Sequence, residues 1–318
     1  MKKTILILAI LLVMVGCQNQ AKKAPDVITT SFITYDLTKH IAPDLDIELL
    51  VKPGQNLHGY EPTAQDMMMI EDAKIFIYTN PYMEPWVESL VTNNKNIIDA
   101  SQNIHYLESD HTHDQDDEHD QDDEHDHDDE HDHDDEHDHD HGTYDPHVWT
   151  SMKNVKIMVD TITDALIETY PNSQDLYQEN ANELLLTLDS LDQGYRKAFE
   201  QSDIETLVFL GHFGLNYLMH DYGFHYLALF ESMSHESEPT IGQLQTIMDT
   251  IDQLNLEYVF VEELSELKIV DTIETETGVK TLELNSLHNV SKEQFENGIT
   301  FIDIQKQNIE NLKIGLKQ

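Results

Sequence analysis

The stretch Ser173–Gln201, SQDLYQENANELLLTLDSLDQGYRKAFEQ, decides the fold of this 318-residue chain. Its apolar residues recur every three or four positions, at Tyr177, Ala181, Leu184, Leu188, Leu191 and Tyr195. This spacing predicts one helix of about seven turns with a single narrow apolar face. The run Pro171–Ser173 breaks the chain just before it, and Ser173 is a residue type that can cap the new helix.

Short apolar runs alternate with helical stretches on both sides of this helix. The expected strands are Val27–Ile33, Asp46–Val51, Lys74–Thr79, Thr206–Leu210, His225–Leu229, Glu257–Val261 and Val279–Leu284. The expected helices are Tyr35–Ala42, Thr63–Ala73, Pro85–Asn93, Met152–Thr169, Thr240–Leu254 and Phe295–Leu316. The alternation predicts an α/β fold of two lobes, each a mostly parallel sheet flanked by helices, joined by the one long rigid helix. We expect the N-terminal lobe at residues 27–172, the linking helix at 173–201 and the C-terminal lobe at 202–318.

The N-terminus has the order of an export signal. Two lysines precede the apolar run Thr4–Val15, which is too short to span a bilayer. Cys17, the only cysteine, follows a glycine at the end of this run, which resembles a bacterial lipobox. We therefore expect a lipoprotein signal peptide at residues 1–16, a lipid on Cys17 and a polar tether at 17–26. The alternative is a simple secretory signal with an incidental thiol.

The charge of the chain is strongly negative. It carries 18 basic and 62 acidic residues, for a net charge of −44. This balance argues against nucleic acid as a partner, because phosphates require positive charge, and it favours a cationic one. Nineteen of the acidic residues lie within residues 110–141, but the rest of the chain is acidic as well.

Residues 110–141 form a low-complexity segment in which acids alternate with ten histidines. The segment has no apolar residue and cannot bury a core, so we expect it to be disordered. Its histidines are His111, His113, His119, His125, His127, His131, His133, His137, His139 and His141. They provide overlapping sites for borderline metal cations, each weakened by the entropy of ordering the chain. The alternative is a solvating acidic loop. His105 and His141 flank the segment and could belong to it or to the folded chain.

Three other histidines lie in distinctive settings. His58 follows a predicted strand, His147 lies in DPHVW at 145–149, and His212 follows the predicted strand Thr206–Leu210. Loops after strand ends are where open α/β sheets place ligands, and neutral imidazole is the commonest metal ligand. Each histidine alone would more often be an ordinary surface or core residue. Together they predict one metal site in the cleft between the lobes.

From about Val27 to its end, the chain resembles the zinc-specific substrate-binding proteins of the cluster A-I family, which serve metal ABC transporters. The motifs that carry the resemblance are HGYEP at 58–62, DPHVW at 145–149, GH at 211–212 with YL at 217–218, SEPT at 237–240 and VFVE at 259–262. A histidine- and aspartate-rich insertion before the second ligand is typical of the zinc branch. The resemblance implies two lobes joined by a rigid helix, with His58, His147 and His212 binding Zn²⁺.

The resemblance also implies a function. Such a protein captures extracellular or periplasmic Zn²⁺ with high affinity and delivers it to an ABC permease, which works with a cytoplasmic ATPase. It is not an enzyme. It is expected to be a monomer outside the cytoplasm, held to the bacterial cell membrane through lipid on Cys17. The segment 110–141 is then an auxiliary low-affinity collector or sensor of zinc.

The fourth ligand is open at this stage. Manganese receptors of this family place an aspartate after the last strand, where this chain has Asn285, a poor partner for Zn²⁺. Some zinc relatives place an acid three residues further on, where this chain has His288. His288, a water molecule and an acid such as Glu262 are the alternatives.

Zinc is favoured over manganese by the donor atoms. Imidazole suits Zn²⁺, whereas Mn²⁺ prefers oxygen. His212 stands where manganese receptors are expected to have glutamate. A receptor for manganese or another divalent metal is the nearest alternative function.

Two rival functions belong to other classes. One is a surface adhesin or passive metal buffer. The other is an extracytoplasmic zinc hydrolase, because three histidines and a water also form catalytic sites. A hydrolase needs a general base, and the motif His-Glu-x-x-His is absent around the three candidate histidines.

Overall fold

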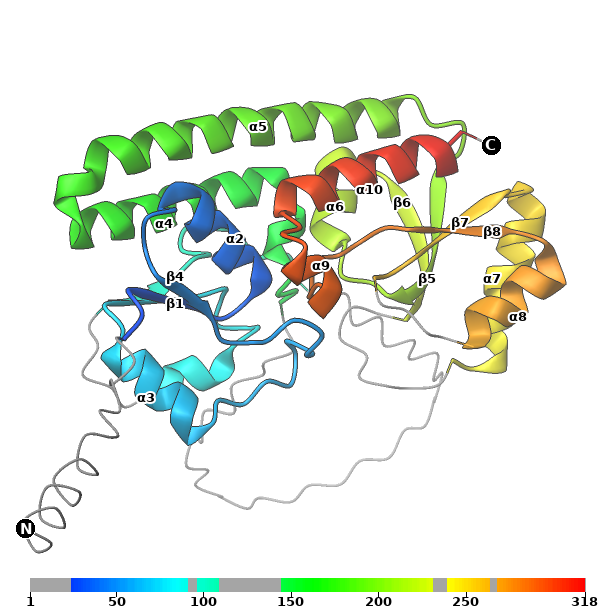
Figure 1. Ribbon diagram of the computed structural model, residues 1–318. Helices are drawn as coiled ribbons and strands as arrows, with labels where there is room; N and C mark the ends of the chain where they lie inside the picture. Colours follow the sequence, from blue (N-terminus) through cyan, green and yellow to red (C-terminus); the bar gives the residue numbers. More distant parts are fainter. Residues whose placement is uncertain (1–23, 91–95, 109–143, 231–238, 264–267, 318) are drawn as a thin grey trace, which may run out of the picture.

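The computed structural model describes residues 24–90, 96–108, 144–230, 239–263 and 268–317. Within these residues the chain forms two α/β lobes, with one long helix running along both (Figure 1). The expected signal peptide, Cys17 and the segment 110–141 lie outside the described residues. No helix among the described residues is long and apolar enough to cross a membrane.

The N-terminal lobe is built on a four-stranded parallel sheet in the order β2-β1-β3-β4. Its strands are β1 (Val27–Thr29), β2 (Ile47–Leu49), β3 (Ile75–Tyr78) and β4 (Ile97–Asp99). Its helices are α2 (Phe32–Ile41), α3 (Ala64–Asp72), α4 (Met152–Thr169) and a 3-10 helix at Pro85–Ser89. The described part of the helix predicted over Pro85–Asn93 is this 3-10 helix, and residues 91–93 lie outside the described residues. Strand β4 was not predicted.

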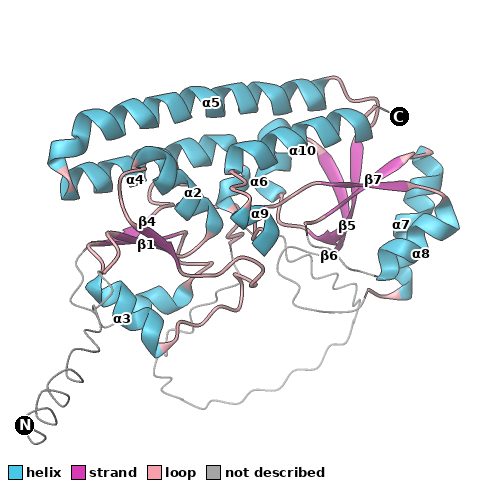
Figure 2. Cartoon of the chain, viewed as in Figure 1, coloured by secondary structure: helices cyan, strands magenta, loops and turns pink. Residues whose placement is uncertain are grey.

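The C-terminal lobe repeats the same plan. Its sheet has the order β6-β5-β7-β8 and is also parallel throughout. The strands are β5 (Thr206–His212), β6 (His225–Phe230), β7 (Tyr258–Val261) and β8 (Lys280–Glu283). The helices are α6 (Asn216–Tyr222), α7 (Ile241–Leu254), α8 (Lys268–Thr277), α9 (Lys292–Glu296) and α10 (Phe301–Gly315). Figure 2 shows the helices flanking both short sheets.

The long helix is α5 (Gln174–Glu200), and it buries all six residues of the predicted apolar face. Its N-terminus differs from the prediction. Residues Pro171–Ser173 form a short 3-10 turn that leads into α5, and the Ser173 side chain makes no capping hydrogen bond. The 3-10 turn leads directly into the first turn of α5, at the position where a capping side chain was expected.

Two boundary predictions are wrong for reasons of capping. The strand expected over Val27–Ile33 ends at Thr29, because Ser31 and Thr34 form a reciprocal capping box that starts α2. The single helix expected over Phe295–Leu316 is two helices. Gly298 takes a φ of 76°, which ends α9, and Thr300 caps α10.

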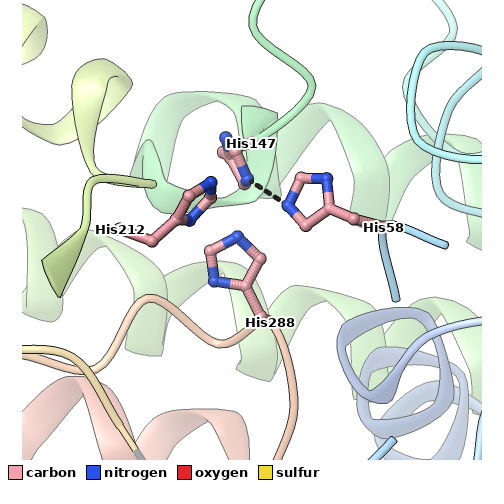
Figure 3. A group of neighbouring side chains, drawn as sticks. All are labelled: His58, His147, His212 and His288. Atoms are coloured by element: carbon pink, nitrogen blue, oxygen red, sulfur yellow. Dashed lines mark hydrogen bonds between the residues drawn. The ribbon is translucent and has the colours of Figure 1, made fainter. Parts of the chain in front are cut away.

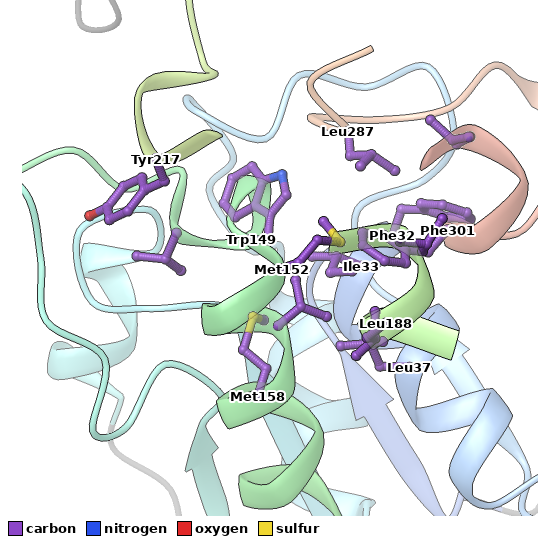
Figure 4. Packing of buried hydrophobic residues seen from close by; sticks show 14 of the residues in the cluster. Phe32, Ile33, Leu37, Trp149, Met152, Met158, Leu188, Tyr217, Leu287 and Phe301 are labelled. Carbon is purple, nitrogen blue, oxygen red and sulfur yellow. The ribbon is translucent and has the colours of Figure 1, made fainter. Parts of the chain in front are cut away.

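One hydrophobic cluster runs through both lobes. Figure 4 shows residues of α2 such as Phe32 and Leu37 packed near Leu188 of α5 and Phe301 of α10. Trp149, fully buried, belongs to the same cluster and donates from Nε1 to the carbonyl of Ser286, 2.8 Å away. Because the core is continuous, relative motion of the lobes would expose apolar surface. Each Å² exposed would cost roughly 25 cal/mol of free energy.

Candidate metal centre

Four histidines from four separate segments meet between the lobes. One ring nitrogen each of His58, His147, His212 and His288 lies within 4.8 Å of the other three. Figure 3 shows the four rings facing a common centre, with Nε2 of His58 and Nε2 of His147 3.0 Å apart. His147 is fully buried, and the other three are partly exposed.

The topology explains why these residues meet. His58 follows β2, His212 is the last residue of β5, and His288 follows β8. In a parallel sheet the carboxyl ends of the strands lie at the same end of the sheet, and here the segments at those ends in both lobes bring their histidines together. His147 enters from the loop just before the 3-10 helix Val148–Thr150, which leads into α4.

A buried carboxylate orients His147. Oδ1 of Asp145 lies 2.6 Å from Nδ1 of His147 and also accepts from its backbone N–H at 2.8 Å. Its other oxygen accepts from Nδ2 of Asn216 at 2.5 Å. Burial alone would raise the pKa of Asp145, but these partners, His147 foremost, lower it to about 2. The ionised carboxylate therefore holds Nδ1–H of His147, so that Nε2 offers its lone pair to the centre.

A second buried carboxylate holds the loop that carries His288. Glu263 accepts from the backbone N–H of Ser286 at 2.8 Å and from that of His288 at 2.9 Å. Burial lowers the pKa of His288, with the neighbouring His147 acting in the same direction. The ring is therefore neutral near pH 7, the form in which imidazole binds a metal.

Glu262, the acid considered for the fourth position, lies outside the group of four, and Asn285 has a different role. Glu262 accepts from the backbone N–H of His212 at 3.2 Å, and burial raises its pKa to about 7. Oδ1 of Asn285 accepts from the backbone N–H of Leu287 at 2.8 Å, which stabilises the turn that presents His288. His105 is exposed and also outside the group, and the ten histidines of 110–141 lie outside the described residues.

Hydrogen bonds join two of the loops that carry the histidines, one from each lobe. The side-chain amide of Asn289 donates to the carbonyls of Lys52, at 3.1 Å, and Gln55, at 2.5 Å. The backbone N–H of Gly54 donates to the carbonyl of Val290 at 2.9 Å. The loop before His58 is thus tied to the loop after His288.

The residues that support the histidines were not predicted from the sequence. Asp145 was noted only as part of a motif, although its position two residues before a histidine is a usable signal for such a pair. Asn80, whose Nδ2 donates to the carbonyl of Pro146 at 2.8 Å, and Glu263 gave no signal. Their partners are distant in the chain, so nothing in the local pattern marks them.

The rings of His147 and His288 lie so close to Gly214 that a side chain at this position would collide with them. Substituting Gly214 therefore tests the arrangement of the histidines. A Cβ atom at this position would lie 2.6 Å from Cε1 of His288 and 3.2 Å from Cδ2 of His147. We expect Gly214→Ala to displace the His288 ring and to weaken metal binding by about 10-fold, comparable with loss of an outer partner. A chelator competition titration measures this. Gly59→Ala, beside His58 but with open space around the added Cβ, is the control and should bind as the native chain does. Equal affinities for all three would contradict the packing described.

Comparison with known proteins finds a matching family model and relatives that align with nearly the whole chain. Residues 27–315 match the family model described as zinc-uptake complex component A, periplasmic. The chain is 31% identical to the high-affinity zinc uptake system protein ZnuA of Bacillus subtilis, over 98% of this chain and 96% of that protein. It is also 31% identical to the zinc-binding lipoprotein AdcA of Streptococcus pneumoniae, over 98% of this chain but 61% of that protein. The chain therefore spans about three fifths of the streptococcal relative.

Solved structures show the same fold. The Zn(II)-bound ZnuA-like domain of Streptococcus pneumoniae AdcA superposes with a TM-score of 0.72 at 28% identity, covering 92% of this chain and 98% of that domain. The metal-dependent lipoprotein YcdH of Bacillus subtilis gives a TM-score of 0.73 at 28% identity, covering 91% of this chain and 98% of that one. Two α/β lobes with a long helix are thus the fold of both.

Proposed function

The chain belongs to the family of periplasmic zinc-uptake components, and from this membership and its site we propose that it is a high-affinity zinc receptor that supplies an ABC-type importer. In this role Zn²⁺ is cargo, bound outside the cytoplasm and released to a permease. The family is one of transport receptors, so we assign no catalytic reaction to the chain.

The convergence of four imidazoles is the observation that carries the proposal. Their ligand nitrogens lie within 4.8 Å of one another, and the ligand set we propose is His58, His147, His212 and His288. Zn²⁺ accepts tetrahedral coordination by nitrogen at about 2.0–2.1 Å without loss, because its d¹⁰ shell imposes no geometry. An Mn²⁺ site would be expected to supply oxygen donors instead.

The partners follow from the same role. We propose that the permease, working with its cytoplasmic ATPase, receives the ion, and that a lipid on Cys17 keeps the receptor at the membrane surface. We further propose that the receptor acts as a monomer, since one chain supplies all four histidines.

Titration of the mature chain with zinc tests the proposal directly. We expect one tight site, from the folded lobes, and additional weaker sites from the ten histidines of 110–141. Competition with a chelator of known affinity should resolve the two classes. Deleting 110–141 should remove the weak class and leave the tight site unchanged. If the deletion abolished the tight site, that site would not be formed by the four histidines of the folded lobes, and the proposed ligand set would be wrong.

Replacing one nitrogen ligand by an oxygen ligand tests the preference of the site for zinc over manganese. We expect His212→Glu to weaken zinc binding and to strengthen manganese binding relative to the native chain, because a hard, charged donor replaces imidazole. Calorimetry with both metals measures the change. His105→Glu, which adds the same charge at an exposed position, should alter neither affinity. An unchanged zinc affinity in His212→Glu would exclude His212 as a ligand.

A further inference from the structure

The ring of His288 has one nitrogen engaged and one left open. Nδ1 is hydrogen-bonded to the hydroxyl of Ser286. Nε2 is buried and has no hydrogen-bond partner among the described residues. The His288 ring centroid lies 4.5 Å from that of His147 and 5.0 Å from that of His58, so the open nitrogen belongs to the metal centre.

The direction of the proton on the Ser286 hydroxyl follows from its other neighbours. Oγ of Ser286 lies 3.0 Å from Oε1 and 3.1 Å from Oε2 of Glu263. An ionised carboxylate can only accept, so the hydroxyl hydrogen points to Glu263. The lone pairs of Oγ then face Nδ1 of His288, which must therefore carry the hydrogen.

The opposite tautomer would be unfavourable in this setting. A hydrogen on Nε2 would be a buried donor without an acceptor among the described residues, which costs about 1–3 kcal/mol. It would also point at the imidazoles that share the centre. In water a free histidine side chain prefers the Nε2–H form, so the protein must reverse the intrinsic preference at this position.

We propose that Ser286 and Glu263 are positioning residues that hold His288 in the Nδ1–H tautomer and so present its Nε2 lone pair to Zn²⁺. The arrangement is a carboxylate–hydroxyl–imidazole relay. It parallels the direct pair of Asp145 with His147, in which the two side-chain atoms are 2.6 Å apart. In the relay the carboxylate oxygen of Glu263 is 3.7 Å from Nδ1, and the hydroxyl fills the gap.

The relay also supplies negative charge near an ion whose direct ligands are all neutral. Four imidazoles leave the ion with its full double charge. Asp145 and Glu263, with side chains 0% and 7% exposed, place one negative charge behind each of two facing histidines. Such outer carboxylates raise the basicity of the imidazole they contact, and their loss typically weakens metal binding by about 10–100-fold.

The inference rests on the proposed zinc function, but its first test needs no metal. Nitrogen-15 NMR of the zinc-free full chain identifies the unprotonated nitrogen of His288, because Nε2 correlates with both ring carbon-bound hydrogens and Nδ1 strongly with only one. We expect the native chain to show an unprotonated Nε2. An unprotonated Nδ1 would overturn the relay while leaving the receptor function intact.

The second test is Ser286→Ala, assayed by zinc competition and by the same spectrum. We expect zinc affinity to fall by about 10–100-fold and Nε2 to become at least partly protonated. Glu263→Gln should weaken binding in the same direction. The control is Ser101→Ala, which removes another buried hydroxyl that donates to a carboxylate, that of Asp99, at 2.5 Å. It should match Ser286→Ala in stability without zinc and the native chain in zinc affinity.

Each remaining outcome is decisive. If Ser286→Ala binds zinc within about twofold of the native chain and keeps its tautomer, the hydroxyl has no positioning role and the proposal is wrong. If Ser101→Ala weakens binding as much, the effect is one of general stability. If instead the native chain binds zinc only weakly, the proposed receptor function is wrong. The NMR spectrum of the zinc-free chain still determines the tautomer of His288, so the two proposals can fail separately.

Discussion

Substituting alanine for His147 should weaken zinc binding by more than about 100-fold, the largest effect expected from any single change in this chain. His147 is the only fully buried member of the four histidines, and it lies against both His58 and His288. Its loss removes a ligand and also leaves the buried carboxylate of Asp145 without its main partner. Leaving this buried charge without its imidazole partner is unfavourable, so the loop that carries residue 147 should rearrange and the remaining ligands should lose their positions.

Competition with a chelator measures the affinity, and thermal unfolding without zinc measures the separate effect on stability. The matched control is His105→Ala, an exposed histidine of the same lobe, which should leave both unchanged. His288→Ala should also weaken binding strongly, though less than His147→Ala, because Asp145 keeps its partner. Native affinity in His147→Ala would mean that the tight site lies elsewhere.

Zinc should raise the melting temperature clearly while leaving the radius of gyration nearly the same. An ion that binds only the folded state stabilises it by about 4 kcal/mol at a thousandfold excess over Kd. For a chain of this size that corresponds to a rise on the order of 10 °C. We expect the radius to stay nearly the same because α5 is continuous over 27 residues and the hydrophobic cluster spans both lobes. The ties of Asn289 to Lys52 and Gln55 act in the same direction.

Calorimetry and solution scattering, with and without zinc, test the two halves of this prediction. Both should use the chain lacking 110–141, since ordering of that segment by zinc would change the radius on its own. Asn289→Ala offers a sharper comparison. Removing the cross-cleft ties should allow the metal-free lobes to separate, so that this variant contracts measurably on zinc addition. A large contraction of the native chain would instead indicate a hinged receptor.

Much of the architecture could be predicted from local pattern. The six apolar residues predicted for the long helix are all buried, and α4 spans the predicted Met152–Thr169. A helix that buries one face needs apolar residues every three or four positions, and this spacing can be read directly from the sequence. The sequence also singled out His58, His147 and His212, because each lies at a strand end or in a specific motif, and the structure places these three beside His288.

Tertiary contacts decided the rest. Whether His288, a water or Glu262 completes the group was open, because the answer depends on where the loop after β8 lies relative to three distant segments. Glu263 contacts His288 across 25 positions of sequence, and Asn289 reaches Gln55 across 234. Such contacts carry no periodicity. The sequence by itself determined which elements form and which histidines lie at their ends, since hydrophobic spacing and capping act over a few residues. Only the packed fold decided which of those ends meet, because burial of the shared core sets the distances between segments that have no local relation.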